Sequence, residues 1–274
     1  MQVRRSGYYS WRAAPGDGPG AVKTSQAARI KECFYFHRRR YGSRRIAAEL
    51  KIGRFRTRPV MKRERLRAIA PKRFTPPTTD SNHGLTLSPN LLQSAANTPL
   101  DKGEVFVGDI TYLRLRSDGF CYLACLQDKF TRRIVGWKVG TPMTAQLVID
   151  VFLQARRRGL LGKSAIIHTD RGSQYASVDY RRLLYIGGFR QSMSRRGNCY
   201  DNAQAESFFS RFKAELVENG VFESVEQARS EVFSYIEGYY NRIRLHSSLG
   251  YKSPIQFENE LKIKTKRSRE SFVS

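Results

Sequence analysis

Three acidic residues stand in surroundings that suggest chemistry. Asp109 interrupts an otherwise apolar run, and an ionised carboxylate in the middle of a strand costs several kcal/mol unless it is paired or metal-bound. Asp170 ends the apolar run 165–169, and functional sites collect at the carboxyl ends of strands in open α/β sheets. Considered singly, each aspartate has a structural explanation of about equal weight: a salt bridge for Asp109 and a turn cap for Asp170.

Glu206 is the third acidic residue, and it falls in a helix predicted over residues 203–218. Lys213 follows two turns later on the same stripe of that helix. For an isolated glutamate, an ordinary solvated face would be the better explanation. Asp201 is predicted to cap the helix, with Gln204 three residues later as in a capping box, so we assign Asp201 to structure. The apolar residues predicted to form the buried side are Ala205, Phe208, Phe209, Phe212 and Leu216.

The combination of the three carboxylates is more informative than any one of them. Sixty residues separate Asp109 from Asp170, and 35 separate Asp170 from Glu206, so two strands and a helix can bring them to one sheet edge. Such hard oxygen ligands fit octahedral Mg²⁺ or Mn²⁺. Two ions about 3.5–4 Å apart activate the attacking oxygen and stabilise the leaving oxygen in phosphodiester displacement. The sequence therefore predicts metal-dependent phosphodiester chemistry.

The charge of the chain indicates a polyanionic partner. Its 274 residues carry 49 Lys and Arg against 24 Asp and Glu, a net charge of +25. Residues 1–75 hold 21 of the basic residues and 4 of the acidic ones, a net +17. Nucleic acid is the first candidate and an anionic membrane the second. No apolar run is long enough to span a bilayer, and no secretory signal is evident, which disfavours the membrane.

The cysteines and histidines show no metal-binding or disulfide spacing. The four cysteines are scattered, which favours a reduced, cytoplasmic compartment. Cys121 and Cys125 are the only close pair, and they lie in a strand-like run. We therefore expect two buried thiols there rather than a zinc site.

Residues 1–70 predict a basic, helix-turn-helix-like module that binds DNA, with Arg44 and Arg45 among the candidate contacts. One helix is expected over 23–41. A second is expected over 44–51, capped by Ser43, and a third starts at Thr57 and reaches about Ile69. The alternative is a basic helical bundle docked on a larger domain.

Residues 71–103 are rich in proline, threonine, serine and asparagine without periodicity, and predict a linker. Residues 104–258 predict a catalytic core of mixed α/β class. Residues 259–274 predict a basic tail, with the run 262–269 disordered. Within the core, strands are expected at 104–115, 120–127, 132–139, 164–169 and 189–193, and helices at 143–158, 179–186, 201–218 and 225–240. This is the order of a ribonuclease-H-like fold.

Several long blocks of the sequence match a known family. They surround the three carboxylates and continue beyond them: 108–112, 132–137, 168–175, 192–198, 200–208 and 240–251. In these blocks the chain resembles the DDE transposases of bacterial insertion sequences, the second-frame type whose core is similar to retroviral integrases. The resemblance runs from Arg5 to about Phe257.

This resemblance implies a ribonuclease-H-like core in which Asp109, Asp170 and Glu206 are the catalytic residues and hold Mg²⁺ or Mn²⁺. It implies cleavage and transfer of DNA strands, with the element ends and the target as DNA partners. Pairing of two ends favours a homo-oligomer on DNA. The family usually adds a first-frame subunit, which is a further expected partner. The expected location is the bacterial cytoplasm, at the nucleoid.

Other basic residues are expected to contact DNA. Lys213 would bind a phosphate close to the metals. Arg195 and Arg196 lie in the loop 194–198, which either closes over DNA or is an ordinary solvated loop. Arg242 and Arg244 lie in the stretch 239–251, which mixes aromatic and basic residues. Either this stretch stacks on DNA or contacts its backbone, or its tyrosines pack on the core while its arginines face water.

Three rival functions stay open at this level. A ribonuclease-H-type nuclease would share the fold and cleave without joining. A DNA-binding protein without catalysis would share the charge. A membrane-surface module would need a basic amphipathic helix with a wide apolar face, and no stretch of the sequence supplies one convincingly.

Overall fold

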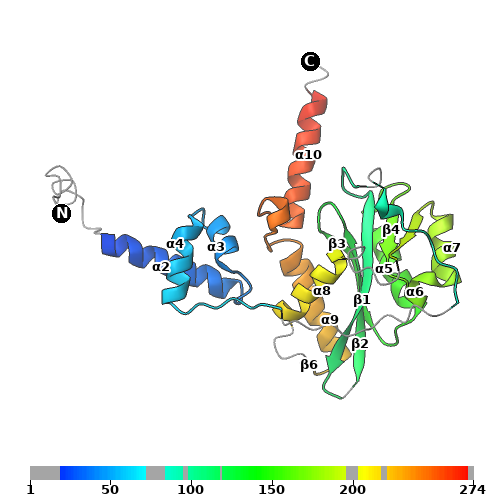
Figure 1. Ribbon diagram of the computed structural model, residues 1–274, viewed down its shortest axis with the longest axis horizontal. Helices are drawn as coiled ribbons and strands as arrows, with labels where there is room; N and C mark the ends of the chain where they lie inside the picture. The colour runs from blue at the N-terminus through cyan, green and yellow to red at the C-terminus, as the bar shows by residue number, and fades with distance from the viewer. Residues whose placement is uncertain are drawn as a thin grey trace. The chain divides into compact units, whose positions relative to one another are not determined.

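The computed structural model describes residues 19–71, 84–94, 98–117, 119–195, 203–216 and 221–270, with side chains from 25 to 264. It divides into two compact units, Met1–Ala70 and Pro71–Ser274, which are treated separately below (Figure 1). Among the helices of these residues, none is long and apolar enough to cross a membrane.

The first unit contains the helices α2 (Pro19–Phe36), α3 (Ser43–Glu49) and α4 (Arg54–Arg63). The prediction that Ser43 caps α3 is wrong: Gly42 is the N-cap, and Ser43 is the first helical residue. The predicted start of the third helix at Thr57 is also wrong. Gly53 caps α4, and the Thr57 hydroxyl donates to the Gly53 carbonyl at 3.2 Å.

α4 also ends earlier than the predicted Ile69. Arg65 has a left-handed φ of 53°, which turns the chain out of the helix. The Leu66 N–H then returns to the Met61 carbonyl at 2.8 Å, so the end of the helix is satisfied by a backbone hydrogen bond. Pro59 lies inside α4, where it removes one helical donor.

The second unit is a mixed sheet with helices on both faces (Figure 1). Its main path has the order β3-β2-β1-β4-β5. β1, β2 and β3 are antiparallel neighbours, while β4 and β5 run parallel to β1. The strands are β1 (Val105–Leu115), β2 (Phe120–Asp128), β3 (Ile134–Gly140), β4 (Ile166–Thr169), β5 (Arg190–Met193) and the short β6 (Val221–Phe222), which pairs with the far end of β1. The predicted ribonuclease-H-like order is confirmed.

Each face of the sheet has its own apolar core. α5 (Ala145–Arg157), α6 (Ser173–Ala176) and α7 (Val178–Ile186) contribute to one core, and α8 (Ala203–Leu216) and α9 (Val225–Phe233) to the other. α5 lies close to β3 because Gly136 has no side chain: a Cβ there would be 2.4 Å from the Val151 carbonyl oxygen. The predicted single helix over 225–240 is instead α9 followed by a π-helical segment, Ser234–Tyr240.

Part of the expected linker is an ordered component of the second unit. Residues 84–94 include a 3-10 turn, Leu91–Gln93, that lies beside β5. The Ser88 hydroxyl donates to the Gln191 side chain at 2.8 Å, and the Leu91 N–H donates to the Ser192 hydroxyl at 2.9 Å. The prolines that led to the linker prediction are also compatible with an ordered, extended backbone, because proline fixes φ. Residues 72–83 and 95–97 of the expected linker lie outside the described residues.

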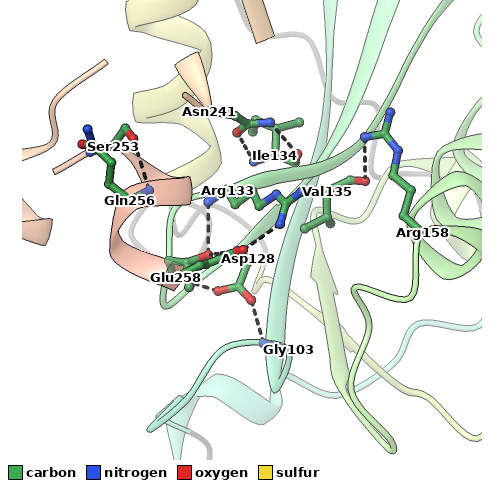
Figure 2. A network of polar contacts seen from close by, with 11 residues as sticks. Gly103, Asp128, Arg133, Ile134, Val135, Arg158, Asn241, Ser253, Gln256 and Glu258 are labelled. Atoms are coloured by element: carbon green, nitrogen blue, oxygen red, sulfur yellow. Dashed lines mark hydrogen bonds and ion pairs between the residues drawn. The ribbon is translucent and has the colours of Figure 1, made fainter. Parts of the chain in front are cut away.

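The expected disordered tail is also corrected, because α10 (Pro254–Glu270) is helical across the run 262–269. A polar network attaches the start of α10 to the turn after β2 (Figure 2). The Glu258 carboxylate accepts from Arg133 at 2.6 Å and from the Thr131 hydroxyl at 3.3 Å. Asp128 holds the same turn, accepting from the N–H groups of Gly103 and Phe130. These contacts anchor the helix before the basic run begins.

Candidate active site

Asp109 faces the α8 side of the sheet. Alternate residues of a strand point to opposite faces, and Leu113 and Leu115 of β1 belong to the core under α8. Asp109 is an even number of residues from both leucines, so its side chain points to the same face. Its cross-strand partner on β2 is Cys125, which lies in the same core. The carboxylate is partly buried and accepts the Ile110 N–H at 2.8 Å.

Asp170 lies beside Asp109 at the end of the neighbouring strand. β1 and β4 are parallel, and Val107 is in register with His168. Two residues beyond that pair, β1 carries Asp109, and the segment just after β4 carries Asp170. The Gly172 N–H donates to Asp170 Oδ1 at 3.0 Å, which orients this carboxylate at the turn after β4. His168 is fully buried, and its Nδ1 lies 2.8 Å from the Ser192 hydroxyl, which gives this histidine a structural role.

Glu206 and Lys213 approach the aspartates from α8. The helix is held on the sheet by its buried aromatic residues Phe208, Phe209 and Phe212, as predicted. Glu206 is on the exposed side of the first two turns. The Lys213 Nζ lies 4.0 Å from the centre of the Tyr112 ring, a cation–π contact with a residue of the strand that carries Asp109.

The pKa values of these groups show that they share one electrostatic field. Burial, and then the negative charges of Asp170 and Glu206, raise the pKa of Asp109 well above its usual value, while the Ile110 N–H and Lys213 oppose that rise. Burial and Asp170 also raise the pKa of Glu206. Burial lowers the pKa of Lys213, and Asp109 opposes that change. Three carboxylates that repel one another form a site that a divalent cation would stabilise, and their oxygens are the ligands that Mg²⁺ and Mn²⁺ prefer.

A hydrogen-bond chain that the sequence did not reveal holds the start of α8. The Gln204 side chain donates to Gln127 Oε1 at 3.0 Å and to the Asp128 carbonyl at 3.4 Å. The Gln127 side chain in turn donates to the Tyr240 hydroxyl at 2.8 Å. The Gln204 side chain thus contacts β2, a contact that was not predicted; the capping box predicted with Asp201 falls on a residue outside the described ones. The sequence offers only the presence of Gln204 two positions before Glu206, which does not by itself identify Gln127 or Asp128 as its partners.

A second set of contacts that the sequence reading missed holds the end of α8. Glu215 on this helix and Arg244 after the π segment are both buried and form an ion pair. Arg244 belongs to the stretch whose arginines were expected to face water or DNA, and for Arg244 that prediction is wrong. Its neighbour Arg242 is exposed.

The contacts described for the other basic candidates do not involve Asp109, Asp170 or Glu206. Arg44 is exposed on α3, and the Arg45 guanidinium lies 5.6 Å from the centre of the Tyr41 ring. Arg195 is exposed after β5, and Arg196 lies outside the described residues. Cys121 and Cys125 are buried free thiols, as predicted.

Two family models match the second unit, and both are described as an integrase core domain. One matches residues 100–199 and the other residues 187–254. The first of these ranges contains Asp109 and Asp170, and the second contains Glu206 and Lys213. The matches therefore cover the part of the chain that brings the three carboxylates together.

Curated relatives match almost the whole chain. The transposase InsF of insertion sequence IS3A from Escherichia coli K12 is 40% identical over 273 residues, covering 95% of this chain and 92% of the relative. A 31 kDa protein of insertion element IS600 from Shigella sonnei is 38% identical, covering 94% and 96%. Among solved structures, the simian T-cell lymphotropic virus intasome with a PP2A regulatory subunit has a TM-score of 0.49 at 14% identity, covering 84% of this chain and 73% of that one.

Proposed function

Because this chain belongs to the family of IS3-type insertion-sequence transposases with an integrase core domain, we propose that Asp109, Asp170 and Glu206 are its catalytic residues. The protein is a polynucleotidyl transferase that moves DNA by strand cleavage and strand transfer. The observation that supports the triad most is the mutual electrostatic effect of the three carboxylates, which come from β1, the end of β4 and α8.

Integrase-like cores of this type depend on divalent metal. Asp109, Asp170 and Glu206 are the residues that would hold Mg²⁺ or Mn²⁺ here. When bound, such ions supply charge neutralisation and activation of the attacking oxygen. The distribution of the carboxylates over three elements means that the metal site depends on the packing of α8 on the sheet as well as on the strands themselves.

The reaction consists of two displacements at phosphorus. In the first, the oxygen of water bonds to a phosphorus atom at the element end, and the bond to the 3′ oxygen breaks to leave a 3′ hydroxyl. In the second, that 3′ hydroxyl bonds to a phosphorus atom of the target, and a target 3′ oxygen leaves. The protein forms no covalent bond to DNA, so its own contribution is alignment and stabilisation of negative charge.

Lys213 provides a cation beside this chemistry. Its ammonium group is held over Tyr112 and is influenced by Asp109, so it can bind a DNA phosphate beside the carboxylates. Arg195, Arg196 and Arg242 would extend the DNA path on the second unit, and Arg44 and Arg45 would contact DNA from the first unit.

The DNA partners are the element ends and the target. Joining of paired ends favours a homo-oligomer on DNA, and a first-frame subunit would supply further recognition of the ends. A protein that acts on bacterial DNA works in the cytoplasm, at the nucleoid.

A strand-transfer assay tests the proposal. The full chain is incubated with a labelled end fragment of its element, a target plasmid and Mg²⁺ or Mn²⁺. We expect joined product from the native chain and none from Glu206→Gln or Asp109→Asn. Asp179→Asn, an exposed carboxylate at the start of α7, is the matched control and should retain activity.

The assay separates the rival functions. Metal-dependent cutting without joining would assign the chain to the nucleases. Binding of DNA without cutting or joining, even after addition of the first-frame subunit, would assign it to the non-catalytic binding proteins. Joining by Asp109→Asn would show that the triad is misassigned.

A further inference from the structure

The first unit contains a second group of metal-ligand side chains, which the strand-transfer chemistry does not use. Cys33 Sγ, a ring nitrogen of His37 and a carboxylate oxygen of Glu49 all lie within 4.8 Å of one another. Cys33 and His37 are one helical turn apart, because the His37 N–H donates to the Cys33 carbonyl at 3.2 Å. Glu49 is the last residue of α3. We propose that these three residues bind Zn²⁺, with water as the fourth ligand.

The donor set is one that zinc prefers: a thiolate, an imidazole and a carboxylate. With metal–ligand distances of about 2.0–2.3 Å, the ligand atoms of a tetrahedral zinc site lie about 3.3–3.8 Å apart. His37 Nε2 is 2.8 and 3.0 Å from the two oxygens of Glu49, so one side chain must withdraw by about half an ångström. Glu49 can do so, since its side chain is 33% exposed and His37 is fully buried.

The buried ligands are already held in place. The His37 ring is stacked on Tyr41, with the ring centres 3.6 Å apart and the planes 8° from parallel. Cys33 is buried on α2 one turn before His37. A site in which two ligands are fixed and the third is adjustable loses little conformational entropy when it binds a metal.

The charges at the site also favour a dication. A thiolate, a carboxylate and Zn²⁺ sum to zero, which makes a partly buried site feasible. Cys33 is in the last turn of α2 and Glu49 is the last residue of α3, and the C-terminal turns of helices favour positive charge. Without metal, burial and the Glu49 carboxylate raise the pKa of Cys33 to about 12, and zinc therefore has to displace a thiol proton when it binds.

The two metal sites of the chain would differ in chemistry. The oxygen-only triad prefers Mg²⁺ or Mn²⁺, whereas a site with a thiolate and an imidazole selects zinc. Zinc at Cys33, His37 and Glu49 would link α2 to α3. Small helical units have limited cores and depend on such links for stability. The proposed zinc therefore serves the fold of the first unit and not the reaction.

Cobalt spectroscopy on the full chain tests this site. The protein is stripped of metal with a chelator and titrated with Co²⁺, which replaces Zn²⁺ and gives a thiolate-to-cobalt charge-transfer band only when a cysteine is a ligand. In the native chain we expect the band to reach its full intensity at one equivalent of Co²⁺ per chain and to disappear when Zn²⁺ is added. Cys33→Ser should lack the band. Cys121→Ser, which removes a buried thiol of β2, is the matched control and should retain it.

A second variant and a second readout guard against misfolding. Glu49→Gln keeps a hydrogen-bonding side chain but removes a direct ligand. It should raise the Kd for zinc by about 100-fold or more, which exceeds the usual effect of removing a hydrogen-bond partner of a ligand. In the native chain, zinc should slow amide exchange in α2 and α3 and leave α5, which carries none of the proposed metal ligands, unchanged. Absence of the band at about 1 mM Co²⁺, or its persistence in Cys33→Ser, would overturn the proposal. Neither readout depends on strand transfer, so the result is independent of the triad.

Discussion

Arg244 and Glu215 form a buried, bidentate ion pair: Nη2 lies 2.6 Å from Oε1, and Nε lies 2.8 Å from Oε2. The Tyr235 hydroxyl donates to the same carboxylate at 2.9 Å. Glu215 is on α8, the helix that carries Glu206, and Arg244 lies beyond the π segment. The pair therefore joins the end of α8 to the chain that follows the π segment.

Removal of one partner of this pair should strongly destabilise the second unit. Arg244→Met leaves a buried carboxylate without its cation, which costs about 3–5 kcal/mol of unfolding free energy. Arg242→Met, an exposed neighbour, should change that free energy by less than about 0.5 kcal/mol. Denaturant unfolding followed by circular dichroism measures both. A change of similar size in the two variants would contradict the structural role of the pair.

Asp109→Asn should abolish strand transfer and stabilise the metal-free protein. Burial and the neighbouring carboxylates raise the pKa of Asp109, so its ionised form is less stable in the folded chain than in the unfolded chain. We expect the Tm of the metal-free variant to exceed that of the native chain by about 2–4 °C at neutral pH, the effect of about 1 kcal/mol.

The pH dependence of that difference checks its cause. The penalty is fully present above the raised pKa of Asp109 and disappears as the pH falls below the ordinary value of an unfolded aspartate. Calorimetry without metal should therefore show the two Tm values converging at acidic pH. A constant difference between the two chains would show that the gain comes from packing instead.

Gln204 should act as a positioning residue for Glu206. Gln204→Ala removes the hydrogen bonds to Gln127 and to the Asp128 carbonyl, which hold the first turn of α8 on β2. We expect strand transfer to fall by about 10–100-fold, with half-saturation at a higher Mn²⁺ concentration. Gln146→Ala, whose side chain is exposed on α5, is the control. An unchanged Mn²⁺ dependence would mean that Gln204 does not position the metal ligand.

Lys213 should contribute to DNA binding at the reacting phosphate. Lys213→Gln should weaken binding of the element end and reduce the slope of log affinity against log salt by about 1. Lys163→Gln, an exposed lysine before β4, should leave that slope unchanged. Fluorescence anisotropy over a range of salt concentrations measures both. Equal slopes for Lys213→Gln and the native chain would remove Lys213 from the DNA contacts.

The order of strands and helices in the second unit followed from the sequence because local patterns encode it. Apolar strand runs, turn residues and the helical stripe of Phe208, Phe209 and Phe212 each depend on neighbours in the chain. The ends of elements were less accurate. The π segment after α9 and the early end of α4 at Arg65 depend on backbone geometry that residue type specifies only weakly.

The candidate triad was also within reach of the sequence. A carboxylate inside an apolar strand, such as Asp109, is costly enough to be conspicuous without any structure. Contacts between residues far apart in the sequence could not be predicted in this way. Arg244 was expected on the surface, because nothing near it in the sequence indicates that folding brings it 2.6 Å from Glu215 and buries it.

Sequence alone therefore determined the class of fold and the basic character of the chain, and it predicted three candidate carboxylates, since these depend on composition and short-range order. Tertiary structure decided which polar groups meet. Cys33, His37 and Glu49 show the difference: the four-residue spacing of the first two is unremarkable, and the third comes from another helix. Their approach depends on how α2 packs against α3, a relationship that arises only when the chain folds in three dimensions.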